Sequence, residues 1–420
     1  MKRLITAILA LCFFVLTSCG SPVQPEISGD TSYVVSNSSA IDRTDESEPY
    51  GNASETVSDI PWKIPEDIEN PSQGLDLLLM VVDGAPAYSV AGLGSCKDEY
   101  IIIPSTVDGI PVVEIADYAF RRMPGGIGQI TGVYCGNRVT KIGENAFVGC
   151  PNLKSVIIPD SVTEIGACAF NNLPSLEKVE FGGRVKTMGK NVFGGCAKLR
   201  RVELSYCLEV IPDSAFSGCR SLEEVVISSN VKSIEAGAFD DCSIKKLLIP
   251  ASVSSIAFNA FDNSTEIEID PNNPFLQILD ESIYSKDKTQ LFVYRGHDGA
   301  ELPEGILSIG ADAFSVSTVK TIVLPESLLI ISEGALEYGN GVNITRDVYM
   351  KNGVKSIGNY AFGTISGTVN IHYDGTKDEF GSITKSEYWY YGLRGFASNT
   401  VNVFCTDGEL KYAYEFVYNG

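Results

Sequence analysis

Apolar residues recur along most of the chain at an interval of about 23 residues. One half of each interval reads Leu-x-x-Val-x-Ile, in which apolar and polar positions alternate, and this alternation predicts a short strand. A proline or a polar residue ends the segment, and a Val-x-x-Ile-Gly turn follows. In the central part of the chain the pattern begins at Leu153, Leu176, Leu199 and Leu222.

An Ala-Phe pair marks the other half of each interval. From Phe147 to Phe261, successive phenylalanines are separated by 23, 23, 23, 23 and 22 residues. Alanine allows two backbones to approach closely, and phenylalanine fills the space between successive turns of chain. The pairs and their two variants are Ala119-Phe120, Ala146-Phe147, Ala169-Phe170, Val192-Phe193, Ala215-Phe216, Ala238-Phe239, Ala260-Phe261, Ala313-Phe314, Ala335-Leu336 and Ala361-Phe362.

Repetition at this period predicts a repeat solenoid over residues 75–369. A single coil buries too little apolar surface to offset the conformational entropy that it loses on folding, so coils must stack and share their strands. We therefore expect a β-rich coil in which short parallel strands are joined by short helical or 3₁₀ turns.

The first 18 residues have the features of a signal peptide. A basic start precedes an apolar run over residues 4–16, which is too short to span a bilayer. The run ends in Leu16-Thr17-Ser18-Cys19, which resembles a bacterial lipobox; the resemblance implies cleavage before Cys19, a lipid on its sulfur, and a surface-exposed protein anchored to the bacterial membrane. The alternative is an ordinary secretory signal in which Cys19 is incidental.

Residues 19–74 would comprise the lipidated cysteine and a disordered linker. Between residues 20 and 60, Ser, Thr, Asn and Pro are frequent, and Arg43 is the one basic residue against eight acidic ones. Such a segment buries little apolar surface and stays solvated. About fifty flexible residues have an end-to-end distance of roughly 40 Å, enough to hold a folded domain away from a membrane.

The repeat resembles the BspA-like leucine-rich repeats, a 23-residue bacterial type, over about residues 76–405. The segment Asp270-Pro271-Asn272-Asn273-Pro274 resembles the long insertion of that family, which we place at residues 264–303. Residues 370–420 resemble its C-terminal element and are expected to cap the solenoid. The resemblance implies a right-handed leucine-rich-repeat coil and, for function, surface adhesion to host matrix proteins, plasma proteins or other cells.

Charge and composition argue against several function classes. The formal net charge is -21, from 32 basic and 53 acidic residues, so we expect no nucleic-acid partner. Only His297 and His372 occur, which excludes most multi-histidine metal sites. No Gly-x-Ser-x-Gly, His-Glu-x-x-His or Walker motif is present, so we expect no enzyme, no cofactor and no metal. A hydrolase would need an acid–base site that the sequence does not locate.

Four cysteines follow the phenylalanine position by three residues: Cys150, Cys196, Cys219 and Cys242. They could form a metal or redox ladder, or they could be small buried hydrophobes stacked coil upon coil. Thiolate ligands need CxxC-type clusters, which one cysteine per 23 residues does not supply, so we favour the core. Without Cys12 and Cys19, nine cysteines remain, and an odd number argues against a complete disulfide framework.

Charged residues occupy the outward positions of the predicted strands. In a solenoid these positions form one continuous face, which is the usual recognition surface. They could equally form a salt-bridged face that only keeps the protein soluble. The residues are Lys154, Glu177, Lys178, Arg200, Arg201, Glu203, Glu223, Glu224, Lys245 and Lys246, with Lys320 further along.

Tyr388, Trp389, Tyr390, Tyr391 and Phe396 form an aromatic cluster near the C-terminus. They could stack on a sugar or a peptide. We favour the other interpretation, in which they cap the last hydrophobic coil, because that coil would otherwise face water.

Two function hypotheses remain. The first is a surface lipoprotein whose monomeric solenoid binds a protein on a host or on another cell, through many contacts along a rigid face. The alternative is a glycan- or nutrient-binding surface lipoprotein with an aromatic site in residues 370–405.

Overall fold

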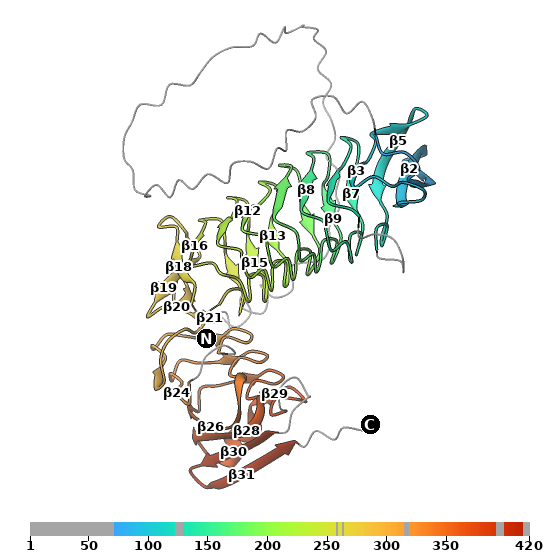
Figure 1. Ribbon diagram of the computed structural model, residues 1–420. Coiled ribbons are helices and arrows are strands. Elements are labelled where there is room, and N and C mark those ends of the chain that lie inside the picture. The colour runs from blue at the N-terminus through green and yellow to red at the C-terminus, as the bar shows by residue number, and fades with distance from the viewer. Residues whose placement is uncertain are drawn as a thin grey trace, which may run out of the picture. The chain divides into compact units, whose positions relative to one another are not determined.

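The computed structural model describes residues 71–121, 129–257, 259–262, 264–314, 319–391 and 399–414. The predicted signal peptide, Cys19, nearly all of the predicted linker and Phe396 lie outside these residues. The described chain consists mainly of short strands and turns that repeat coil after coil (Figure 1).

The Leu-x-x-Val-x-Ile segments form one line of parallel strands, here called the long-strand ladder. Its strands pair in register, so that Val156 lies beside Val179 and Val202 beside Val225. The valines point inward and the residues on either side of them point outward. The strands are β3 (Tyr100–Ile102), β6 (Gly132–Tyr134), β8 (Ser155–Ile158), β10 (Lys178–Phe181), β12 (Arg201–Glu203), β14 (Glu224–Val226), β16 (Lys246–Ile249) and β18 (Glu266–Ile269).

The Val-x-x-Ile-Gly segments form a second parallel line, the short-strand ladder. Only glycine fits after the isoleucine, because the backbone of the preceding coil lies very close there. A Cβ on Gly166 would lie 2.5 Å from the backbone nitrogen of Glu144. A Cβ on Gly189 would lie 2.2 Å from the backbone nitrogen of Ala167. The strands are β5 (Ile110–Ile115), β7 (Lys141–Ile142), β9 (Glu164–Ile165), β11 (Thr187–Met188), β13 (Val210–Ile211), β15 (Ser233–Ile234) and β17 (Ser255–Ile256).

The Ala-Phe pairs form a third line of contacts between coils, on turns. The N–H of Phe147 donates a hydrogen bond to the carbonyl of Ala169 at 2.9 Å, and Phe193 donates to Ala215 at 2.8 Å. From Phe120 to Phe239, successive rings stack with centroids 5.0–5.5 Å apart and interplanar angles of 3–12°. The Ala-Phe line thus joins each of these coils to the next around an apolar core. The two strand ladders are hydrogen-bonded in separate groups, with breaks between β10 and β12, between β14 and β16, and between β11 and β13.

The residue before each alanine has a left-handed backbone, which the sequence analysis did not anticipate. Its φ is 55° at Asn145 and at Cys168, for example. Gly, Asn and Asp adopt this conformation at low cost, and they occupy six of the ten positions. The ten positions are Tyr118, Asn145, Cys168, Asn191, Ser214, Gly237, Asn259, Asp312, Gly334 and Tyr360.

The stack of rings ends at Phe239, and the Ala-Phe line itself is interrupted between Phe261 and Phe314. The guanidinium of Arg295 lies 5.7 Å from the ring centroid of Phe261, and Tyr294 stacks on Phe314 at 4.4 Å. Tyr294 takes the place of a phenylalanine, because its N–H donates to the carbonyl of Ala313. The predicted insertion contains β19 (Leu276–Leu279), β20 (Ser282–Ser285) and β21 (Gln290–Val293), which pair antiparallel.

After the interruption both ladders resume. The short-strand ladder continues from β21 through β23 (Ser308–Ile309), β25 (Ile330–Ile331), β27 (Ser356–Ile357) and β29 (Thr384–Lys385). The other sheet has the order β22 (Ala300–Glu301), β24 (Thr321–Val323), β26 (Tyr338–Lys351), β28 (Thr364–Asp374), β30 (Asn399–Cys405) and β31 (Gly408–Tyr414). Its last pair is antiparallel.

The prediction of a β-rich repeat solenoid with short parallel strands is confirmed, and two details differ. In the described part of the chain, the connections are hydrogen-bonded turns and the one helix is α2 (Lys377–Ser382), because a left-handed residue at each turn interrupts any run of helical backbone. The boundary expected at residue 370 falls inside β28, which pairs with both β26 and β30.

An early strand pair was also missed. β1 (Asp76–Val82) and β2 (Ala85–Gly92) form an antiparallel hairpin whose two-residue turn is Asp83-Gly84, with φ of 51° and 79°. An Asp-Gly pair between apolar runs is a strong hairpin signal. β2 then pairs with β5 and joins the hairpin to the short-strand ladder.

Substitution of a stacked phenylalanine should destabilise the solenoid strongly. Phe193 is fully buried between Phe170 and Phe216, so Phe193→Ala should lower the free energy of unfolding by about 3–5 kcal/mol through lost burial and a cavity. Urea denaturation followed by circular dichroism measures the change. Leu248→Ala is the control, because Leu248 is 55% exposed and its loss should cost about 0.5 kcal/mol or less. Equal shifts for the two variants would contradict the packing role of the ring.

Candidate binding surfaces

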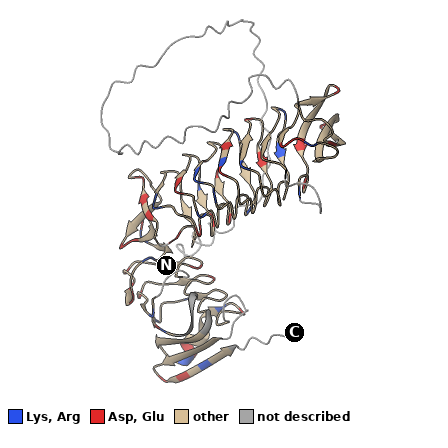
Figure 2. Ribbon diagram, viewed as in Figure 1, with Lys and Arg blue, Asp and Glu red and all other residues tan. Residues whose placement is uncertain are grey.

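We call the outward positions of the long-strand ladder from β8 to β18 the charged strand face. Figure 2 colours the charged residues along the ribbon. Strands β10, β12, β14 and β16 begin with Lys178, Arg201, Glu224 and Lys246, so these side chains occupy the same position in successive coils. Of the ten residues predicted for this face, Glu177 is half-buried and the other nine are exposed. The structure therefore places the predicted set on one outward face.

Part of this face is neutralised by ion pairs. Arg201 lies 2.9 Å from Glu224 in the next coil and 3.7 Å from Glu203 on its own strand. Lys246 lies 2.7 Å from Glu268, and Lys178 pairs with Glu180. Exposed pairs of this kind contribute about 1 kcal/mol or less each, so they make the face soluble without adding much stability.

A second row of charges precedes the strands and is largely unpaired. Lys154, Arg200 and Lys245 occupy this position in every second coil, and Glu177 and Glu223 occupy it in the coils between them. No ion pair of these three cations occurs within the described residues. Their charges are therefore available to a partner.

Two apolar side chains interrupt the charges. Glu203 pairs in register with Val226, and Leu248 pairs with Glu268. Val226 is 39% exposed and Leu248 is 55% exposed. The sequence analysis did not single them out, although both stand at an outward position of the strand motif where neighbouring coils carry glutamate.

The aromatic cluster at residues 388–391 lies mainly inward. Trp389 is buried, and its ring contacts those of Phe362, Phe380 and Tyr412 at 5.9, 5.9 and 4.9 Å. Tyr388, Tyr390 and Tyr391 are half-buried around it. This packing favours the capping interpretation, because the largest ring of the cluster is not accessible to a ligand.

A different set of rings is exposed. Tyr349, His372 and Phe404 occupy the same outward position on β26, β28 and β30 and stack on one another, with centroids 4.5 and 5.4 Å apart. We call them the aromatic ladder. Val323 is the corresponding residue on β24. A valine is shorter than a tyrosine, so it leaves the outer face of the Tyr349 ring partly uncovered, and Tyr349 is 45% exposed.

A row of polar side chains runs beside the aromatic ladder. Asn402 donates a hydrogen bond to Asn370 at 3.0 Å, and Asn370 donates to Oδ1 of Asp347 at 3.1 Å. The Nε2 atom of His372 lies 3.1 Å from the same Oδ1. Within the described chain, Oδ2 of Asp347 and the hydroxyl of Tyr349 have no hydrogen-bond partner and can serve a ligand.

The repeated cysteines are packing residues that also donate hydrogen bonds between coils. The Sγ of Cys150 donates to the carbonyl of Phe120, and Cys196, Cys219 and Cys242 repeat this contact at 3.2 Å each. Cys150, Cys196 and Cys219 are fully buried, as expected for core residues. All nine cysteines in the described ranges are free thiols.

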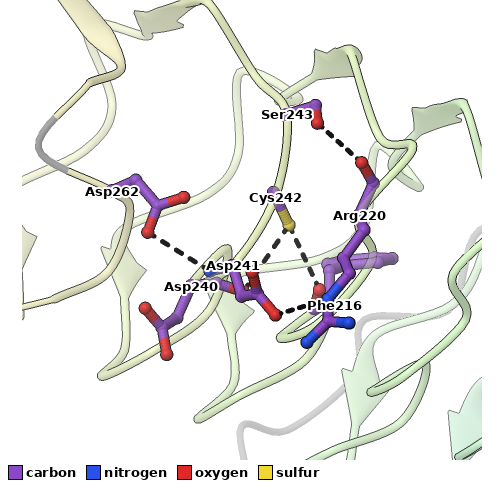
Figure 3. A network of polar contacts seen from close by, with 7 residues as sticks. All are labelled: Phe216, Arg220, Asp240, Asp241, Cys242, Ser243 and Asp262. Carbon is purple, nitrogen blue, oxygen red and sulfur yellow. Dashed lines mark hydrogen bonds and ion pairs between the residues drawn. The ribbon is translucent and has the colours of Figure 1, made fainter.

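Cys242 is half-buried beside a small acidic group (Figure 3). Asp241 accepts from Arg220 at 2.8 Å, and its backbone N–H donates to Asp262. Burial, with the neighbouring carboxylates Asp262, Asp240 and Asp241, raises the pKa of Cys242 to about 12. The thiol therefore stays protonated, which disfavours nucleophilic or metal-binding chemistry at this position.

The described residues do not bring several metal-ligating side chains together. They contain no group of three His, Cys, Asp or Glu side chains arranged to hold a metal ion. The carbonyl of His297 accepts a hydrogen bond from the Tyr294 hydroxyl, which is a loop contact. Across the same residues, no helix has the length and apolar character needed to cross a membrane.

The buried thiols should resist alkylation at mildly alkaline pH. Burial raises the pKa of Cys135 and Cys150 to about 12, so at pH 8 roughly one such thiol in ten thousand is ionised, against about a quarter for an ordinary cysteine. We expect slow labelling by iodoacetamide that accelerates above about pH 11 or on unfolding in urea. Peptide mass spectrometry measures it, with half-buried Cys207 as the control. Labelling of Cys150 as fast as Cys207 at pH 8 would contradict the packing described here.

Three solved structures are similar to parts of this chain. A leucine-rich cell surface protein from Faecalibacterium prausnitzii is 21% identical, with 75% of this chain and 97% of that chain covered and a TM-score of 0.48. The pneumococcal vaccine antigen PcpA is 19% identical, with 75% and 95% covered and a TM-score of 0.45. The leucine-rich repeat protein TpLRR of T. pallidum is 27% identical, with 45% and 81% covered and a TM-score of 0.37. No curated protein matches the chain.

The family comparison is decisive. The model of the BspA type leucine rich repeat region matches six copies of its repeat in residues 140–268 and 289–386. These ranges make up more than half of the chain and coincide with the coils described above. The chain therefore belongs to the BspA-type leucine-rich repeat family.

Proposed function

We propose that the protein is an exported surface protein whose solenoid binds a partner protein on the charged strand face. The observation that carries this proposal is the set of unpaired cations Lys154, Arg200 and Lys245, which alternate with glutamates along one repeat position, beside exposed Val226 and Leu248. Unpaired cations attract an acidic partner, and a small apolar centre that loses water on contact adds affinity. The partner would be a protein with an acidic surface.

The long-strand ladder suits protein binding because its backbone is rigid. Strands in a sheet are spaced about 4.8 Å apart, so side chains at one repeat position form a regular row. Backbone hydrogen bonds and stacked rings hold that row in place before a partner arrives. A preorganised surface loses less conformational entropy on binding than a loop would.

Location and ligand complete the proposal. Residues 1–18 would direct export, a lipid on Cys19 would anchor the protein to the bacterial membrane, and residues 19–74 would tether the solenoid. The partner would be a host matrix or plasma protein or a protein on another cell, bound by a monomer. Family membership and the N-terminal sequence support this assignment, and no cofactor or nucleic acid enters it.

The aromatic ladder supports a second candidate function, saccharide binding. Sugar rings pack their C–H groups against aromatic faces, and the outer face of Tyr349 is partly uncovered. The unpartnered oxygen of Asp347 and the Tyr349 hydroxyl supply an acceptor and a donor for sugar hydroxyls. Because Asp347 is anionic, the ligand would be a neutral or amino saccharide.

Charge reversal on the charged strand face should weaken protein binding. The double variant Arg200→Glu, Lys245→Glu should lower the affinity for a bound matrix or plasma protein about tenfold or more, mainly through a slower association rate. Surface plasmon resonance on a panel of immobilised matrix and plasma proteins measures both quantities at low and physiological salt.

Lys141→Glu with Lys186→Glu is the matched control for this experiment. It changes the net charge equally, but Lys141 lies on β7 of the short-strand ladder, where it pairs with Glu114 and Glu164. The control should bind like the unaltered protein. Equal weakening by both double variants would assign the effect to net charge and would exclude the charged strand face.

Tyr349→Ala should weaken saccharide binding about tenfold while protein binding persists, because the ring face lies outside the charged strand face. A glycan array identifies the saccharide, and titration calorimetry compares the variants. Phe275→Ala, at an aromatic residue that is 47% exposed before β19, is the control. An array on which no neutral or amino saccharide binds would contradict this candidate.

A further inference from the structure

Strand β1 has an unusual concentration of exposed apolar side chains. Leu79 and Val81 are 64% and 72% exposed on one face of the strand, and Leu78 is 58% exposed on the other. Val82 is also exposed, and Leu77 and Met80 are half-buried. Solvation of so many apolar groups on one short strand is costly, and such patches mark interaction sites.

The backbone of β1 is open along one edge. β1 pairs with β2 on one side and ends the order of its sheet, so within the described chain no strand lies on its other side. In an antiparallel hairpin, alternate residues direct their N–H and C=O groups away from the partner strand. Val82 and Ala85 flank the two-residue turn and form the hydrogen-bonded pair next to it. The following pair, Val81 with Pro86, is therefore a non-hydrogen-bonded pair. This agrees with Pro86, which has no N–H to donate to Val81. Leu79 and Val81 therefore direct their backbone groups to the open edge.

This edge lacks the usual protection against pairing. Natural edge strands carry lysine, proline or an inward charge, or are covered by another element. Residues 71–96 contain neither lysine nor arginine, and their charged residues are Asp76 and Asp83, one at each end of β1. The edge is apolar along its length and acidic at both ends.

We propose that β1 binds an extended segment of a partner protein, which adds to the sheet as a further strand. The segment would be apolar in its centre and basic at its ends, to match the apolar edge and the flanking carboxylates. A second copy of this chain is a poor match, because its own β1 is flanked by the same two carboxylates and by no basic residue. The site lies on other strands than the charged strand face and does not depend on that surface.

A blocked seven-residue peptide tests the proposal, with lysine at both ends and alternating valine and threonine between them. Fluorescence anisotropy of the labelled peptide with the full chain should show saturable binding that weakens with salt. The same peptide with glutamate ends should bind several-fold more weakly, and one with N-methylated backbone amides should not bind. Leu79→Lys and Val81→Lys should each weaken binding about tenfold or more, and neither should disturb folding because both side chains are exposed.

Val210→Lys is the matched control, since it places the same charge at an apolar residue, 42% exposed, on β13 of the short-strand ladder. It should leave peptide binding unchanged. Three results would overturn the proposal: no binding at millimolar peptide, equal binding by Leu79→Lys and the unaltered protein, or dimerisation of the unaltered protein that Leu79→Lys abolishes in sedimentation velocity.

Discussion

Each coil is attached to the next at the Ala-Phe turn, where a phenylalanine N–H donates to the alanine carbonyl one coil later and the ring stacks on its counterpart. Strands of neighbouring coils can pair only if the contacts at the Ala-Phe turns keep the coils at a constant distance from one another. The left-handed residue before each alanine turns the chain so that the ring points inward. Cysteine, glycine and alanine at their repeat positions serve the same spacing, because larger side chains there would separate the coils.

That constraint leaves the interior no capacity for chemistry. The repeated residues are occupied with packing, and the buried thiols are held protonated by their surroundings. The outward positions are those where side chains vary without cost to the core, and the functions that we propose use them. Outward positions carry mostly charged or short polar side chains, so residues of another kind there point to a binding role. Val226 and Leu248 stand where neighbouring strands carry glutamate, and the three rings of the aromatic ladder stand beside short polar side chains.

The interruption between Phe261 and Phe314 shows how much irregularity the solenoid tolerates. The antiparallel strands β19–β21 replace one coil, and Arg295 and Tyr294 cover the rings of Phe261 and Phe314 on either side of it. At the C-terminal end the last parallel strand is closed by the antiparallel pairing of β30 with β31, while Trp389 and its neighbours fill the core. At the other end β1 has no such cover within the described chain.

The sequence by itself determined the coil period, the two kinds of short strand and the position of the core, because each depends on apolar spacing within one repeat. It also placed Lys154, Arg200 and Lys245 on an outward face. Only the tertiary structure decided which charges were paired, since Arg201 reaches Glu224 across 23 residues of chain. The same holds for the aromatic residues: Trp389 and Phe404 look alike in the sequence, but one closes the core and the other stacks on His372 in solvent. The exposure of an aromatic side chain depends on which strands become its neighbours. The repeat pattern does not specify those neighbours where the coils are irregular.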